Sequence, residues 1–148
     1  MPNEDAGGLR FIRYGAISAL IVVAAGAFGA HALRSRLTPD LLIVFETGAR
    51  YQMYHALALM AVGLLHLHRP HRLLVWAARL FLTGTVLFAG SLYLLAITGE
   101  RWLGGFTPIG GAAFLGGWGF LALGGWSRQG REDLNRRGAE DAEKNRTT

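Results

Sequence analysis

The chain contains no cysteine among its 148 residues, which excludes disulfide bonds, thiolate metal sites and thiol nucleophiles. Charged residues are also scarce, at 17% of the chain, whereas hydrophobic residues make up 51% and glycine occurs 21 times. Such proportions are unusual for a small soluble domain. The composition therefore favours a protein that lies mostly in lipid.

Sequence patterns associated with catalysis are missing as well. No serine, histidine and carboxylate have a spacing typical of an activated nucleophile, and no apolar segment contains a pair of carboxylates. The glycine pairs at 104–105 and 110–111 are more typical of loops and close helix packing than of a phosphate-binding loop. We therefore predict no enzymatic activity, no catalytic residue and no cofactor.

The chain does have four apolar segments, each close to the roughly 20 residues that cross a hydrocarbon core as a helix. They cover about 14–33, 51–68, 73–98 and 106–126. The predicted fold class is all-α, an integral membrane bundle of four transmembrane helices over 13–126. Residues 40–48 are too few and too polar to span, so we predict a short interfacial helix before the second span. A cleaved signal peptide in place of the first span is disfavoured, because its apolar run exceeds a typical signal core.

The charge distribution predicts the orientation of the chain and argues against nucleic acid as a partner. The net charge is +5, but the basic residues flank the apolar segments and form no stripe with interleaved aromatics. Lys and Arg favour the side of the N-terminal segment 1–12, the loop at 69–72 and the tail 127–148, so both termini should be cytoplasmic. The tail is polar and charged, and we predict that it is disordered.

Small residues at four-residue spacing predict where the helices approach one another closely. The pairs are Ala25 with Gly29, Gly26 with Ala30, Ala112 with Gly116 and Ala113 with Gly117. We predict that they pack the first helix against the fourth within one chain. A seam between copies in a homo-oligomer is the alternative.

Polar side chains from three of the predicted helices gather in the outer half of the membrane. The candidate polar cluster consists of His31, Glu46, Arg50, Tyr51, Gln52, His55, Ser91 and Tyr93. An ionisable residue inside a span is energetically unfavourable unless it finds a partner. Because His31 and His55 should lie at similar depth on adjacent antiparallel helices, we favour a hydrogen-bonded clasp between them. The alternatives are snorkelling to the interface, a metal or haem site, and a proton-handling pair.

A second group of histidines, His66, His68 and His71, surrounds the loop with Arg69 and Arg72. We interpret it as a basic interfacial loop turned by proline 70. Metal binding by a His-rich tract is the alternative.

Four motifs in order carry a resemblance to a known family. They are GAFGAH at 26–31, YQMYHALAL at 51–59, SLYLL at 91–95 and TPIGG at 107–111, followed by Gly117 and Trp118. Over about 13–125 the chain resembles the small bacterial membrane-protein family named after YgdD, domain of unknown function 423, whose eukaryotic relatives are the transmembrane protein 256 group. The resemblance implies a four-helix protein of the bacterial inner (plasma) membrane with no established activity. On it, His31, His55, Tyr51, Gln52 and Pro108 fall on signature positions.

Two functions are compatible with these patterns. The first is a non-enzymatic membrane component that packs with lipid, a protein partner or a second copy through its small-residue faces. The second is a small transport or ligand-handling protein that uses the outer polar cluster.

Overall fold

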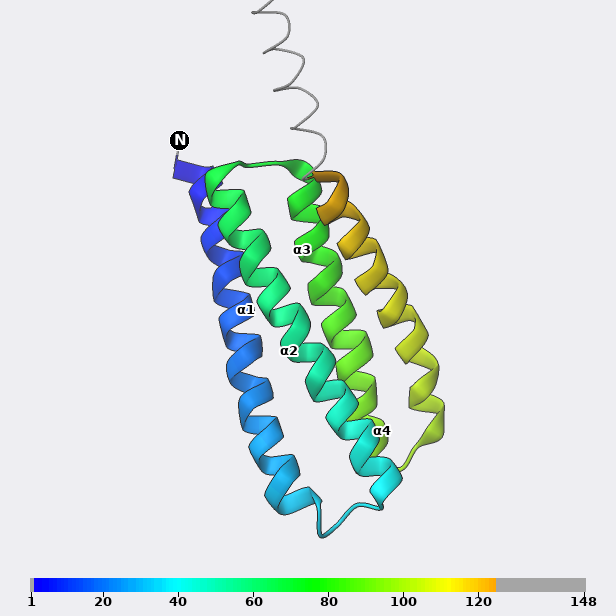
Figure 1. Ribbon diagram of the computed structural model, residues 1–148. Helices are drawn as coiled ribbons and strands as arrows, with labels where there is room; N and C mark the ends of the chain where they lie inside the picture. The colour runs from blue at the N-terminus through cyan, green and yellow to red at the C-terminus, as the bar shows by residue number, and fades with distance from the viewer. Residues whose placement is uncertain (1, 125–148) are drawn as a thin grey trace, which may run out of the picture.

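The computed structural model describes residues 2–124, with side chains at 7–29 and 31–124, and every regular element in that part of the chain is a helix (Figure 1). The elements in order are α1 (Pro2–Phe28), the π-helical η1 (Gly29–Leu33), α2 (Pro39–His68), α3 (Arg72–Gly84), the π-helical η2 (Thr85–Ala89), α4 (Gly90–Thr98) and the 3-10 helix η3 (Arg101–Phe106). A last helix follows directly and covers 107–124. The predicted tail at 127–148 lies outside the described residues.

Three helical segments are long and apolar enough to cross a membrane. They are Gly7–Leu33, Arg72–Thr98 and Arg101–Gly124. These segments agree with the first, third and fourth predicted spans. α2 is not among them although it has 30 residues, because polar Gln52, His55 and His66 interrupt its apolar sequence. All three side chains are buried against other helices.

The predicted interfacial helix at 40–48 is wrong as a separate element, because α2 runs unbroken from Pro39 to His68. Its start follows the sequence: the Leu41 N–H donates to Thr38 Oγ1 at 3.4 Å, and a proline occupies the first helical position. Nothing at 40–48 stops the helix. The Thr47 hydroxyl donates to the Ile43 carbonyl at 2.8 Å within the same helix. The residues predicted to form a separate helix are therefore the first turns of α2.

α2 lies between the other helices, with α1 along one side and the continuous α3–η2–α4 helix along the other (Figure 1). A Cβ atom at Gly63 would lie 2.8 Å from the Gly8 carbonyl oxygen near one end of α1, and one at Gly29 would lie 2.9 Å from the Phe45 ring near the other. α1 and α2 are therefore packed along their whole shared length. The last helix, yellow to orange in Figure 1, lies against α3 and α4.

The buried apolar side chains form two clusters, and large apolar side chains also cover the outside. The larger cluster contains Ala58, Leu59, Val62, Leu74, Ala77, Ala78, Phe81 and Phe114, and the smaller one contains Leu33, Phe45 and Ala96. On the outer faces, Leu20, Val86 and Leu115 are exposed by 70%, 71% and 76%. So much exposed apolar surface suits contact with lipid rather than water.

The predicted packing residues have different neighbours from those expected. A Cβ atom at Gly117 would lie 2.6 Å from the Phe81 ring, and one at Gly116 would lie 3.2 Å from Leu80, so this stripe packs on α3. On the first membrane helix, Ala25 of α1 and Gly29 of η1 pack on the cluster around Phe45 of α2. The predicted contact of the first helix with the fourth is therefore wrong for these residues. Each helix packs instead on a helix to which a short connection joins it.

Two of the predicted packing residues face outward. A Cβ atom at Gly26 would meet no atom within 4 Å, and Ala112 is exposed. The side chain of Ala30 lies outside the described residues. Gly26 and Ala112 therefore contribute to the outer surface rather than to packing within the chain.

Gly15 offers a test of how closely α1 approaches α2. Its substitution by alanine would place a Cβ atom 2.5 Å from Met60 Cγ and 2.7 Å from the Ala56 carbonyl oxygen. We expect Gly15→Ala to separate the helices and destabilise the fold by roughly 1–3 kcal/mol, as overpacking does. Gly26→Ala on the same helix should leave stability unchanged. Thermal melting in mild detergent, followed by circular dichroism, compares the two, and equal melting temperatures would contradict the close approach.

Candidate functional site

The amide of Gln52 joins three helices inside the bundle. Its Nε2 donates to the Ser18 carbonyl oxygen at 3.1 Å and lies 3.3 Å from the Ser18 hydroxyl oxygen. The Tyr93 hydroxyl donates to Gln52 Oε1 at 2.8 Å. The orientation of the amide follows from these partners, because a backbone carbonyl can only accept. This hydrogen-bonded chain, here named the Gln52 clasp, links α1, α2 and α4.

His55 faces α3 and the last helix, and both of its ring nitrogens have partners. Nδ1 lies 2.8 Å from the Tyr51 carbonyl oxygen, which can only accept, so Nδ1 carries the proton. Nε2 is then an acceptor, and the Trp118 indole donates to it at 3.2 Å. The imidazole is stacked on Phe114 with ring centroids 3.4 Å apart, and the Phe81 ring lies 5.5 Å away. His55 is thus a neutral donor and acceptor inside an aromatic cage.

The predicted clasp between His31 and His55 is wrong. His31 lies in η1 at the end of the first membrane helix and is exposed. His55 does form a hydrogen bond between helices, but its partner is Trp118. No site role was predicted for Trp118 or Ser18. An isolated serine inside the first apolar segment and a tryptophan shortly after the last motif were the available indications.

The other members of the predicted cluster do not form one site. Ser91 and Thr107 share a hydrogen bond between their hydroxyl oxygens at 3.0 Å, which joins α4 to the last helix. The Tyr51 ring packs on Phe88, with ring centroids 4.7 Å apart. Glu46 and Arg50 are exposed on α2. The candidate cluster therefore separates into the Gln52 clasp, the His55 cage and the Ser91 pair, with charged residues outside all three.

Two grooves on the surface of the bundle include residues of α2 in their lining. One, of about 680 Å³, is lined mainly by aromatic rings and includes Tyr51, Tyr54, His55 and Trp118. The other, of about 480 Å³, lies over the Gln52 clasp between α1 and the π-helical segment η2. Both are open to the outside. π-Helical segments often occur at functional sites.

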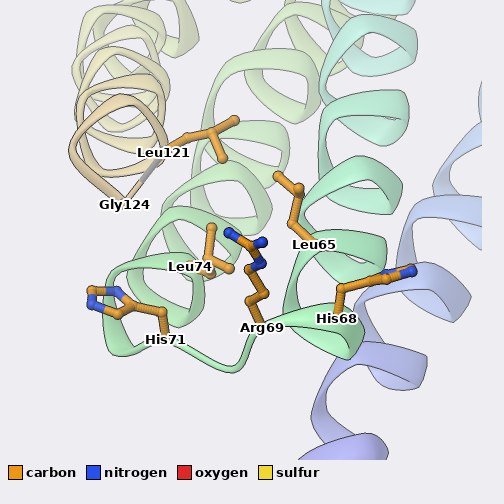
Figure 2. Close-up of a pocket in the computed structure, with 7 residues that line it drawn as sticks. All are labelled: Leu65, His68, Arg69, His71, Leu74, Leu121 and Gly124. Carbon is orange, nitrogen blue, oxygen red and sulfur yellow. The ribbon is translucent and has the colours of Figure 1, made fainter. Parts of the chain in front are cut away.

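A third, smaller pocket of about 290 Å³ lies at the end of the bundle that carries the α2–α3 loop (Figure 2). Its walls come from three elements: Leu65 of α2, Leu74 of α3, and Leu121 with Gly124 of the last helix. The side chain of Arg69 extends from the loop between Leu65 and Leu74, whereas the imidazoles of His68 and His71 point to opposite sides (Figure 2).

The three histidines of this region have separate roles rather than a common ligand. His66 is buried and packs edge-on against Phe11 of α1, with ring centroids 5.9 Å apart. His68 Nδ1 donates to the Leu64 carbonyl oxygen at 2.9 Å. His71 caps α3, because its Nδ1 accepts from the Leu73 N–H at 3.2 Å. Within residues 2–124, no three His, Asp or Glu side chains are grouped so that they could hold a metal ion.

Comparison with known proteins relates the chain to a family without an assigned activity. The family described as "Protein of unknown function (DUF423)" matches residues 25–111. A UPF0382 membrane protein of Staphylococcus saprophyticus is 44% identical over 113 residues, which cover 76% of this chain and 93% of the relative. The UPF0382 membrane protein YwdK of Bacillus subtilis is 44% identical, covering 73% and 89%. The UPF0382 inner membrane protein YgdD of Escherichia coli is 39% identical over 110 residues, covering 74% and 84%. No solved structure matches.

Removal of one oxygen atom, the Tyr93 hydroxyl, should weaken the Gln52 clasp. Tyr93→Phe removes the hydroxyl that donates to Gln52 Oε1 and leaves the ring in place. We expect a loss of roughly 0.5–2 kcal/mol of stability, the range for hydrogen bonds between membrane helices. Tyr54→Phe, at an exposed ring on the same face as the aromatic groove, is the matched control. Equal melting temperatures of both variants and the wild type would contradict a stabilising clasp.

Proposed function

We propose that the chain, which belongs to the DUF423 family of proteins of unknown function, is a non-enzymatic, multi-pass component of a bacterial inner membrane. One of its relatives carries the name inner membrane protein. The chain packs in that membrane with lipid, a partner protein or a second copy. The observation that best supports this proposal is the use of its interior polar groups. The Gln52 amide and both nitrogens of His55 are engaged between or within helices, as structural hydrogen bonds in lipid should be.

Four spans follow if α2 crosses the membrane together with its neighbours. At 30 residues, α2 is about 45 Å long, more than the roughly 30 Å hydrocarbon core. It lies alongside α1 from one end to the other, and α1 contains a segment apolar enough to span. Gln52, His55 and His66, which lower its hydropathy, are buried, so these side chains need not face lipid. An even number of spans places both termini on one side, and the excess of basic residues favours the cytoplasmic side.

The absence of native cysteine makes this topology directly testable. Ser35 lies in the turn before α2, and Pro70 lies in the loop after it. We expect Ser35→Cys to react with a membrane-impermeant maleimide in intact cells, and Pro70→Cys to react only after permeabilisation. The unmodified chain should not be labelled. Equal reactivity of both cysteines in intact cells would mean that α2 does not cross the membrane.

The alternative is a small transport or ligand-handling protein, in which the aromatic groove would bind the solute. The groove's volume of about 680 Å³ falls within the roughly 300–1,000 Å³ of ligand pockets. Tyr51, Tyr54 and His55 are among the residues that line it, whereas His31 is not. A solute bound there would therefore contact the His55 cage.

Native mass spectrometry of protein purified in mild detergent separates the two functions. If the chain is a packing component, wild-type and His55→Ala proteins should retain the same lipids, and the variant should only melt earlier. We expect a loss of roughly 1–3 kcal/mol, because a hydrogen bond and a stacked ring disappear together. His31→Ala should match the wild type. A stoichiometric solute that is present in the wild type and in His31→Ala but lost from His55→Ala would favour ligand handling instead.

A further inference from the structure

The pocket at the α2–α3 loop combines apolar walls with basic groups at one end. Leu65, Leu74 and Leu121 form the walls, and the Arg69 guanidinium extends between two of them (Figure 2). Its volume of about 290 Å³ is at the lower limit of ligand pockets, roughly 300 Å³. A space of this size suits a polar headgroup with the first methylenes of its chains, but not a whole lipid.

The polar groups around the pocket favour an anion. Arg69 carries a permanent positive charge, and Arg72, the first residue of α3, lies three positions further along. His71 Nδ1 accepts a hydrogen bond, so its proton is on Nε2, which is a donor even in the neutral ring. Among residues 2–124, no acidic side chain lines the pocket, and the first turn of α3 contains none. The N-terminal end of α3 adds a partial positive charge.

The place of the pocket in the bundle points to lipid as the source of that anion. The α2–α3 loop, the start of α1 and the end of the last helix lie together at one end of the molecule (Figure 1). The spanning segments end at this level, where the phosphate groups of a bilayer lie. Basic pockets between membrane helices on the cytoplasmic side bind anionic headgroups.

We propose that this pocket binds the phosphate headgroup of an anionic phospholipid, with Arg69 as the charged contact and the first methylenes against Leu74 and Leu121. The inference rests on the proposed function, because it takes the loop to lie at the cytoplasmic membrane surface. It adds to that function a lipid class and a position on the chain.

The test is a lipid titration of the full-length protein in mild detergent, with native mass spectrometry reporting binding of the first lipid. We expect phosphatidylglycerol to bind the wild type more tightly than phosphatidylcholine. Arg69→Gln should weaken phosphatidylglycerol binding roughly fivefold, which corresponds to the attraction of one arginine to an anionic surface. Arg101→Gln, at an exposed arginine in η3 at the opposite end, is the matched control and should bind as the wild type does.

A second variant tests the apolar part of the site without changing charge. Leu121→Trp should fill the space beside Leu74 and reduce phosphatidylglycerol binding, while leaving the weaker phosphatidylcholine binding unchanged. Melting temperatures measured alongside show that each variant is folded. Loss of lipid selectivity in both variants, with Arg101→Gln intact, is the expected pattern.

Several results would overturn the proposal. Equal affinity of the wild type for the two lipids would remove the anionic preference, and wild-type affinity in both Arg69→Gln and Leu121→Trp would place the lipid elsewhere. Displacement of phosphatidylglycerol by inorganic phosphate alone would identify a free anion, rather than lipid, as the occupant. Any of these results combined with the expected cysteine labelling would reject this site but leave the proposed membrane component standing.

Discussion

The hydrogen bonds of Gln52 are the constraint on which the arrangement of the helices depends. In lipid there is no water to satisfy a buried amide, so both of its ends must find partners within the protein. The Gln52 amide finds them on α1 and α4 at once, through Ser18 and Tyr93. Those contacts set the rotation of α2 about its own axis. With Gln52 turned toward α1 and α4, His55 is directed to α3 and the last helix, where Trp118 completes its hydrogen bonds.

This arrangement gives the molecule a mainly apolar interior, which encloses a few polar side chains such as hydrogen-bonded Gln52 and His55, and an apolar exterior. Glycine and alanine allow the close approach, as at Gly84, where a Cβ atom would overlap the Phe114 ring. Dispersion between closely packed helices, rather than exclusion of water, then holds the bundle together in lipid. The same design leaves open grooves and a basic pocket at the surface, where lipid or other helices can be accommodated.

Most of the helical segments could be predicted, because the apolar length of a segment depends only on residues that are neighbours in the chain. Of the four spans predicted from apolar length, three coincide with segments apolar enough to cross a membrane, and the resemblance to the DUF423 family is confirmed. The separate helix at 40–48 was predicted from the polarity of these residues. No proline or left-handed residue ends a helix after residue 48, so α2 continues without a break to His68. The predicted cluster included Gln52, Tyr93 and His55, yet the partners Ser18 and Trp118 were missed. A pattern along one chain indicates which residues are polar, but not which face of each helix meets its neighbour.

The sequence by itself determined that this protein belongs in a membrane, because the apolar length of its segments and the placement of its basic residues depend only on the order of residues. It also determined the family, through motifs whose spacing is a property of the chain. The tertiary structure alone decided that His55 is enclosed while His31 is exposed, that Gly29 packs on α2 while Gly26 faces outward, and that three elements form a pocket around Arg69. The physical reason is that the rotation of each helix is set by all its contacts together, and hydrogen bonds between residues far apart in the chain select one rotation.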